Sequence, residues 1–436
     1  MNPFRYPRPA AVAAFLILFA ASAHAEAIFP VNGPGIGVWE YDQPSVALSG
    51  SRIHIAFVGY GAGTGDFKLY YAAVEGGADF ANTATTRSTV LLTPAVAIDN
   101  GAAYTDARHP RIALRTDNEL VVLFQAVPAG LAAGEYRLFR ARILLANNTV
   151  HTQLVSEILG SGSARLPGTL VDPSFRLVTS DNSLRVAYAD DDAGNVYFAR
   201  VGIDNANVVG SPILLSYLAS SRGVKPIPRL DLDGYNYSHV VWAANDTDAE
   251  PTGIYYSLVR ANPSGVLDNL AIGPTQVISA NKRWGFPCII VLAPTSVWVY
   301  AFDQPFGLPG LAGAMSFIAL NPFAVAHDGN PVNVNNVAAS ALFFLSSPGG
   351  TVLTGEFESY QPEILNDAQG LVHIAGYGYR GGPPNFQGTS GRYFAMGMGS
   401  IGANAATATL ASLSLFPVYV GTGDVSFGTQ IAGDYT

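Results

Sequence analysis

Hydrophobic and polar residues alternate in short runs along most of this chain, and the runs return in the same order six times. Each unit opens with a proline and a short apolar segment. A turn, a second apolar segment, a polar loop and a third segment with aromatic residues follow. Alternation with a period of two, bounded by Gly, Pro, Asn and Asp, is typical of β-strands. The six opening prolines are Pro44, Pro110, Pro173, Pro228, Pro287 and Pro362.

The second segment of each unit is the most regular: RIHIAF, ELVVLF, SLRVAY, YSHVVW, SVWVYAF and LVHIAG. A fourth apolar segment ends each unit, so one unit predicts four antiparallel strands. The opening prolines recur at intervals of 55 to 75 residues, and strand repeats of this length are typical of β-propellers. We therefore expect an all-β fold, a six-bladed β-propeller of four-stranded antiparallel blades. A count of seven stays open if the two termini together form one more blade.

Residues 1–25 have the pattern of a secretory signal peptide. Arg5 and Arg8 precede an apolar run over 10–21, and Ala23-His24-Ala25 matches the small residues of a cleavage site. We expect cleavage near Ala25, a single propeller domain over 26–436, and a secreted or periplasmic protein. No apolar run reaches the ~18 residues that a spanning helix needs, so membrane insertion is not expected.

Composition narrows the class of protein further. The formal net charge is −9, and only 13% of the residues are charged while 49% are hydrophobic. An acidic chain without a basic face is unsuited to nucleic acid, and this apolar content is too high for a disordered protein. The single cysteine, Cys288, cannot form an internal disulfide. We expect it to be a buried thiol in the innermost strand of the fifth unit.

The succession of Pro–apolar strand, apolar–His–apolar strand and aromatic pair resembles the sialidase-like (BNR-repeat) propellers of exported bacterial proteins. The resemblance covers nearly all of 26–436. The Asp-box, Ser-x-Asp-x-Gly-x-x-Trp, and the Phe-Arg-Ile-Pro motif of true sialidases are absent from the sequence. The resemblance therefore implies the propeller architecture and does not imply sialidase activity.

Polar and aromatic residues gather where the innermost strands begin, around the expected axis of the propeller. Ligands of such folds bind on this face, by analogy. Residues before a proline are also restricted to extended or turn conformations, which is the purely structural explanation. The candidate ligand-binding residues of this axial rim are Asp42, Arg108, His109, Asp172, Arg229, Arg283, Trp284, Glu358 and Tyr360.

Two acidic loops are candidates for calcium, since oxygens at alternate positions can surround a hard cation. Neither loop matches a complete calcium-binding loop, and Asp-rich turns that end in glycine are also ordinary hairpin connections. We expect no cofactor other than this calcium. The candidate ligands are Asp190, Asp192, Asp246, Asp248 and Glu250.

Three histidines, His54, His239 and His373, occupy one position of the repeat. Equivalent positions of different blades are spread around a ring, so these imidazoles cannot converge on one metal ion. We expect each to form a hydrogen bond with a neighbouring strand or turn.

The sequence contains no Gly-x-Ser-x-Gly, His-Glu-x-x-His, Cys-x-x-Cys or phosphate-binding glycine motif. The leading hypothesis is therefore a non-catalytic binding module, whose partner is a glycan or an extracytoplasmic protein. Trp284 and Tyr360 would stack on the ligand, and Arg229, Arg283 and His109 would contact its polar groups.

The alternative is a polysaccharide-active enzyme with its site on the central rim. A glycoside hydrolase needs two carboxyl groups, and the candidates are Asp42, Asp172 and Glu358. A polysaccharide lyase needs a base and a cation that neutralises a uronic acid. The candidates for these two roles are His109 or Tyr360, together with Arg108, Arg229 or Arg283.

Overall fold

The structure, a computed structural model, consists of β-strands, turns and two short 3₁₀ segments, η1 (Ser161–Ser163) and η2 (Thr179–Asp181), over its described residues. The all-β prediction is confirmed. In this part of the chain no helix is long and apolar enough to cross a membrane. The described residues are 36–38, 44–49, 52–61, 67–75, 90–99, 104–147, 149–190, 193–216, 227–245, 252–261, 267–304, 314–322, 338–339, 343–344, 363–366, 371–379, 392–400 and 414–421.

The first three units of the repeat form one antiparallel sheet each. In the first sheet a short additional strand, β1 (Ile36–Val38), also pairs with β3. The strands of the first sheet are β2 (Ser45–Ser49), β3 (Arg52–Gly61), β4 (Phe67–Glu75) and β5 (Val90–Ala97). Those of the second are β6 (Tyr104–Thr116), β7 (Glu119–Pro128), β8 (Arg137–Ala146) and β9 (Thr149–Glu157). Those of the third are β10 (Leu170–Val178), β11 (Ser183–Asp190), β12 (Val196–Gly202) and β13 (Ile213–Leu214).

The fourth and fifth units share one eight-stranded sheet, and the sixth forms a four-stranded sheet. The shared sheet contains β14 (Arg229–Leu232), β15 (Ser238–Asn245), β16 (Thr252–Ala261), β17 (Leu267–Ala293), β18 (Ser296–Gln304), β19 (Ala314–Asn321), β20 (Ala338–Ala339) and β21 (Phe343–Phe344). The last sheet contains β22 (Glu363–Asn366), β23 (Leu371–Tyr379), β24 (Arg392–Ser400) and β25 (Ser414–Gly421).

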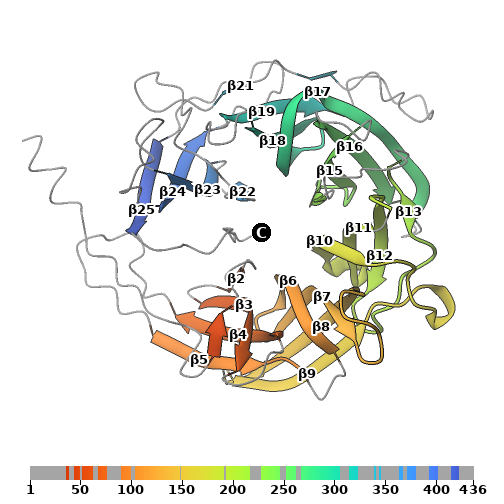
Figure 1. Ribbon diagram of the computed structural model, residues 1–436, viewed down its shortest axis with the longest axis vertical. Coiled ribbons are helices and arrows are strands. Elements are labelled where there is room, and N and C mark those ends of the chain that lie inside the picture. The colour runs from red at the N-terminus through yellow and green to blue at the C-terminus, as the bar shows by residue number, and fades with distance from the viewer. Residues whose placement is uncertain are drawn as a thin grey trace, which may run out of the picture.

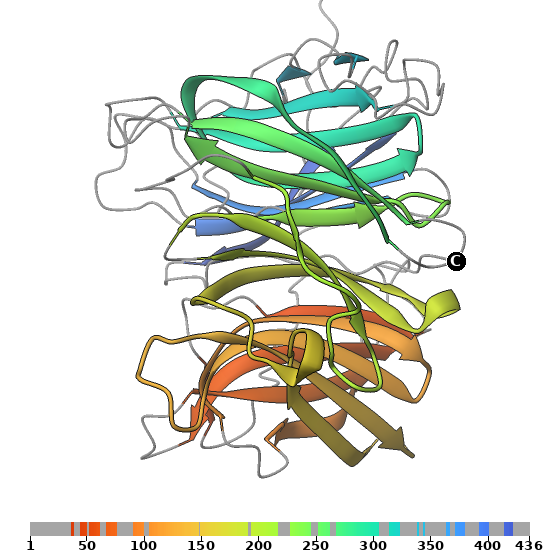
Figure 2. The ribbon, with the colours of Figure 1, turned by 90° about the vertical axis from the view of Figure 1, so that its right-hand side faces the viewer.

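The sheets stand around a central axis, as in a β-propeller (Figure 1). β2, β6, β10 and β22 lie nearest the centre, and β5, β9 and β13 lie at the periphery. Figure 2 shows the same stack of sheets from the side. The long strand β17 pairs with β16 along one part and with β18 along the other, and so joins two units. Sheets and units therefore do not correspond one to one, and the count of six blades stays a prediction.

The prolines of three units lie inside a strand rather than before it, which differs from the sequence prediction. Pro110, Pro173 and Pro287 fall within β6, β10 and β17, and the pairing register shifts at each of them. Proline cannot donate to the ladder of hydrogen bonds, so it is tolerated in a strand where a bulge interrupts the pairing. As a consequence, Arg108 and His109 lie in the bulged part of β6 and not in a loop before it.

Apolar layers between neighbouring sheets form the core. Tyr71 of β4 packs in one cluster with Phe124 and Phe139 of the second sheet. The next layer joins Leu123 of the second sheet to Phe175 of the third, with equivalent layers further around the axis. Each fully buried side chain of this size contributes roughly 1.5–3 kcal/mol. The inner strands are thus held in place from both sides.

Candidate functional site

A small cavity of about 60 Å³ lies on the axis, where the inner strands of five successive units meet. β2, β6, β10, β14 and the final part of β17 each contribute to its wall. Pockets for whole small molecules usually measure 300–1,000 Å³, so this cavity has room for one functional group of a ligand. Its lining residues are Ser45, Arg111, Ile112, Ser174, Phe175, Arg176, Arg229, Leu230, Cys288 and Ile289.

The residue that follows the proline of each unit faces this cavity in all five. In chain order these residues are Ser45, Arg111, Ser174, Arg229 and Cys288, so serine and arginine alternate over the first four units. Each serine also links two units. The backbone N–H of Ile112 donates to the Ser45 Oγ over 2.8 Å, and that of Leu230 donates to the Ser174 Oγ over 3.1 Å. The two serines at this position therefore join the first unit to the second and the third unit to the fourth.

Three arginines stand in the polar lining of the cavity, and one of them, Arg176, is paired with the Asp231 carboxylate. Arg111 and Arg229 are only 7% and 6% exposed, and Arg176 is the third arginine of the wall. Among the lining residues that the structure describes, none is acidic. Like charges that line a concave site focus the field and raise the local concentration of counter-ions.

Asp231 forms hydrogen bonds with two of the inner strands that surround the cavity. Its Oδ1 accepts from the Nε of Arg176 over 2.9 Å, and its Oδ2 accepts from the backbone N–H of Val291 over 2.9 Å. Three units are thereby connected through one carboxylate that is 6% exposed. The Arg229 Nη1 also donates to the carbonyl of Pro228 over 3.2 Å. These contacts restrict the rotamers of two of the three arginines.

Arg108, one of the candidate rim residues, is paired with a carboxylate. Its Nε and Nη2 donate to the Oδ1 of Asp106 over 3.0 and 2.8 Å, and its guanidinium lies 5.0 Å from the centre of the Phe67 ring. The Tyr136 hydroxyl donates to the other oxygen of Asp106. Burial, and then this hydrogen bond, raise the pKa of Tyr136. The Tyr136 hydroxyl is therefore protonated at neutral pH.

The backbone around this cluster is strained. Asp106 and His109 have φ angles of 52° and 46°, in the left-handed region that non-glycine residues rarely adopt. The register of β6 against β7 shifts twice over this stretch, between Thr105 and Arg108 and again between Arg108 and Arg111. Bulges of this kind re-aim side chains and are frequent beside active sites. The strain lies at the His109 position that the sequence indicates as part of the rim.

The remaining candidate rim residues are placed less fully. Arg229 lies at the start of β14 and lines the axial cavity. The backbone of Asp172 belongs to β10, and the backbones of Arg283 and Trp284 belong to β17, but their side chains are outside the described part. Asp42, Glu358 and Tyr360 lie outside the described residues altogether. Convergence of the whole set on one pocket stays a prediction.

Of the candidate calcium ligands, Asp190 is described and takes part in a tight turn. Its Oδ1 accepts from the backbone N–H of Ala193 over 3.4 Å, and its carbonyl accepts from Gly194 over 2.7 Å. Among the described residues no group of three metal-binding side chains occurs. Asp192, Asp246, Asp248 and Glu250 lie outside the described residues.

Two of the three repeated histidines are paired with a tyrosine of the next strand, as predicted. The Nδ1 of His54 lies 2.8 Å from the Tyr71 hydroxyl, and that of His239 lies 2.7 Å from the Tyr256 hydroxyl. Burial, with a smaller effect of Arg52, lowers the pKa of His54 to about 4. Both pairs are structural. For His373 the structure describes the backbone in β23 alone.

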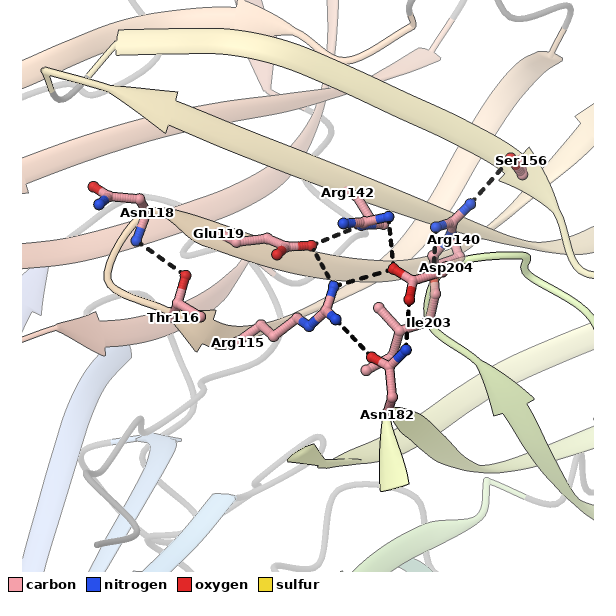
Figure 3. Close-up of polar contacts among 10 residues, drawn as sticks. All are labelled: Arg115, Thr116, Asn118, Glu119, Arg140, Arg142, Ser156, Asn182, Ile203 and Asp204. Carbon is pink, nitrogen blue, oxygen red and sulfur yellow. Dashed lines mark hydrogen bonds and ion pairs between the residues drawn. The ribbon is translucent and has the colours of Figure 1, made fainter. Parts of the chain in front are cut away.

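A second cluster of charges connects the second and third sheets at the other end of β6 (Figure 3). Glu119 accepts from Arg115 over 2.8 Å and from Arg142 over 2.7 Å. Asp204 pairs with the same two arginines over 3.3 and 2.8 Å and also accepts from Asn182 over 2.5 Å. The two carboxylates each pair with the same two arginines, and the cluster joins the two sheets.

The sequence prediction missed Ser45, Arg111, Ser174 and Arg176 as lining residues. The signal was present in the alternation of serine and arginine after the opening prolines. Cys288 is confirmed as a buried thiol of an inner strand, and it also borders the axial cavity.

No known protein-family model matches this chain, and no characterised protein matches it by sequence. Its structure is similar to several solved structures at low identity. A thermostable family-43 glycoside hydrolase is 14% identical with a TM-score of 0.35, over 74% of this chain and 99% of the other. The endosialidase of phage phi92 is 9% identical with a TM-score of 0.42, over 80% of this chain and 63% of the other.

An endo-arabinase from Bacteroides thetaiotaomicron is 11% identical with a TM-score of 0.35, over 72% of this chain and 96% of the other. Several of the similar structures are thus glycan-acting enzymes. Similarity at this level of identity and TM-score does not transfer an activity. The function of this chain has to be inferred from its own residues.

Proposed function

We propose that this protein is an exported six-bladed propeller that binds an acidic glycan at its axis, as a non-catalytic binding module. The arginines of the axial cavity carry this proposal, above all Arg111 and Arg229, since Arg176 is paired with Asp231. Arg111, Arg176 and Arg229 come from three consecutive units and border one space, and guanidinium groups pair strongly with carboxylates. The cavity admits one such anionic group, and the rest of the glycan would lie on the rim.

The experiment measures binding by calorimetry to polygalacturonate, alginate and polysialic acid, with neutral dextran as the reference. An Arg111→Gln/Arg229→Gln double variant is expected to lose at least roughly 30-fold in affinity, since removal of an anchoring arginine typically costs about 2 kcal/mol or more. The affinity of the unchanged protein should also fall as salt is raised. No binding of any acidic polymer would overturn the proposal.

The matched control is Arg165→Gln. Arg165 is 44% exposed and pairs with Glu157 on the outer side of the second sheet, so its loss should leave the affinity unchanged. An Arg111→Lys/Arg229→Lys variant keeps the charge and removes the planar fork of donors. Thermal unfolding of each variant separates a loss of binding from a loss of folding.

A second candidate function is a polysaccharide-active enzyme, and the strained start of β6 favours it. His109 has a left-handed backbone beside Arg108, and the Tyr136 hydroxyl lies close by on Asp106. A lyase would use His109 as the base and an arginine to neutralise the uronic acid. Arg108 is engaged by Asp106, which weakens this assignment.

Ultraviolet absorbance of unsaturated products from polygalacturonate or alginate tests the lyase, and a reducing-sugar assay tests a hydrolase. Turnover that is lost in His109→Ala and retained in Arg165→Gln would establish the enzyme and overturn the non-catalytic role. Binding without turnover supports the binding module.

A further inference from the structure

We infer that the hairpin between β14 and β15 carries a second ligand-binding surface, a tyrosine pair that stacks on a neutral sugar ring. The hairpin spans 233–237, at the far end of β14 from the axial Arg229. Tyr235 is 67% exposed, more than any other large hydrophobic side chain in the described part of the chain. Its ring centre lies 5.9 Å from that of Tyr237, at an angle of 42°.

The hairpin is held in one conformation by Asp233, which is buried. The Oδ1 of Asp233 accepts from the backbone N–H groups of Tyr235 and Tyr237 over 2.8 and 3.0 Å. Its backbone N–H donates to the Tyr237 carbonyl over 3.1 Å, and its carbonyl accepts from Asn236 over 2.9 Å. The exposed ring of Tyr235 is therefore presented on a fixed backbone, beside the half-buried ring of Tyr237, which lowers the entropy cost of binding.

The Asp233 side chain is itself held in place by a buried residue of the neighbouring strand, His239. Its Oδ2 lies 3.3 Å from the Nε2 of His239, and the side chains of both residues are fully buried. The other ring nitrogen of His239, Nδ1, forms a hydrogen bond with the Tyr256 hydroxyl. A chain of three buried polar groups thus supports a loop whose outermost side chain contributes little to the core.

The repeat does not require aromatic residues in this hairpin. The corresponding turns of the second and third units contain Asp117-Asn118 and Ser180-Asp181-Asn182, and the sixth contains Asp367-Ala368-Gln369-Gly370. These turns are polar and lack aromatic residues. The tyrosine pair is particular to the fourth unit. Tyr237 is half-buried and packs against the apolar cluster that the fourth and fifth units share, but packing does not explain the exposed ring of Tyr235.

The chemistry of the surface fits a neutral sugar. Tyrosine combines an apolar ring with a hydroxyl at its edge, and a pyranose combines an apolar C–H face with hydroxyls at its rim. The residue between the two tyrosines in the sequence is the uncharged Asn236, and the Asp233 carboxylate is fully buried. The exposed groups of the hairpin therefore carry no formal charge. This surface is independent of the anion site at the axis.

Affinity gel electrophoresis in xylan, laminarin, soluble starch and galactomannan tests the inference. We expect retardation in at least one gel, a loss of at least roughly tenfold in apparent affinity for Tyr235→Ala, and retained binding for Tyr235→Trp. The control is Tyr60→Ala, because Tyr60 is an exposed tyrosine (39%) of the first sheet that contacts Phe67. The Tyr60→Ala variant should be retarded in the gels to the same extent as the unchanged protein.

Arg111→Gln/Arg229→Gln separates the two sites, since it should abolish acidic-polymer binding and leave retardation in the neutral gels intact. Unretarded migration in all four gels would overturn the inference, as would retardation that Tyr235→Ala leaves unchanged. A protein partner whose capture depends on Tyr235, with no retardation by any polysaccharide, would also overturn it. Urea unfolding of Tyr235→Ala is expected to match the unchanged protein, since this side chain is mostly exposed.

Discussion

The first and fourth units place the same histidine–tyrosine pair in different surroundings. In both units the tyrosine follows the histidine by 17 residues. The distance from the histidine Nδ1 to the tyrosine hydroxyl is 2.8 Å for His54 and 2.7 Å for His239. In the fourth unit the second imidazole nitrogen lies 3.3 Å from Asp233. In the first unit the Nε2 of His54 is buried and has no hydrogen-bond partner among the described residues.

The difference shows which features belong to the repeat and which belong to one unit. The histidine–tyrosine pair follows from two repeat positions that are diagonal neighbours on adjacent strands, since His54 lies opposite Ala73 and His239 lies opposite Leu258. Asp233 belongs to the hairpin of the fourth unit, whose sequence differs from the corresponding turns of the other units, and it connects that hairpin to the pair. The histidine–tyrosine pair is thus common to two units, and in the fourth unit it also binds Asp233 and so stabilises the exposed 233–237 hairpin.

The largest expected effect is that of Asp233→Ala. The change leaves the N–H groups of Tyr235 and Tyr237 and the Nε2 of His239 without this acceptor. The imidazole is fully buried and the two N–H groups are partly buried. A buried group that loses its partner costs about 1–3 kcal/mol, so we expect a loss of about 3 kcal/mol in the free energy of unfolding by urea. Asp117→Ala, in the exposed turn of the second unit, should cost less than about 0.5 kcal/mol. Equal losses in the two variants would contradict the distinction between the units.

The second effect is a pH dependence that belongs to the first unit. The pKa of His54 is about 4 in the folded protein and about 6.5 in an unfolded chain. Below pH 6.5 the unfolded state binds the proton more strongly, so stability falls as pH falls and levels off near the folded pKa. Between pH 6.5 and 5 this amounts to about 2 kcal/mol.

Urea unfolding at several pH values, with His54→Gln as the comparison, measures this effect. The slope between pH 6.5 and 5 should be smaller in the variant. Asp181 and Asp204, whose pKa values are lowered mainly by hydrogen bonds and arginines, add their own loss at lower pH in both proteins. An unchanged slope would show that His54 is not the group responsible.

Much of the fold could be predicted from local patterns. The runs RIHIAF, ELVVLF and LVHIAG became β3, β7 and β23, because period-two alternation and bounding turns act within a few residues. The bulges at Pro110, Pro173 and Pro287 and the continuous β17 were not predicted, since they depend on how an inner strand pairs with its neighbours.

The candidate site was harder to predict for the same reason. Which face of an inner strand meets the axis is decided by ring closure, so Arg111 and Arg176 looked like ordinary strand residues. Arg229 was proposed as a rim residue, and it lines the cavity together with Ser174. The contact from Asp106 to Arg108 and the support of Asp233 for its hairpin could not be inferred either. They depend on left-handed backbone at Asp106 and Asn236, which the sequence pattern does not indicate.

The smallest expected effect compares Tyr71→Phe with Tyr256→Phe. Without the Tyr71 hydroxyl, neither nitrogen of His54 keeps a partner among the described residues, so we expect a loss of about 2 kcal/mol. Without the Tyr256 hydroxyl, His239 keeps Asp233, and the loss should be about 1 kcal/mol. Both substitutions preserve the ring and its packing, so the difference between them isolates the contribution of the aspartate. A greater loss for Tyr256→Phe would mean that Asp233 does not support the imidazole and serves only its own hairpin.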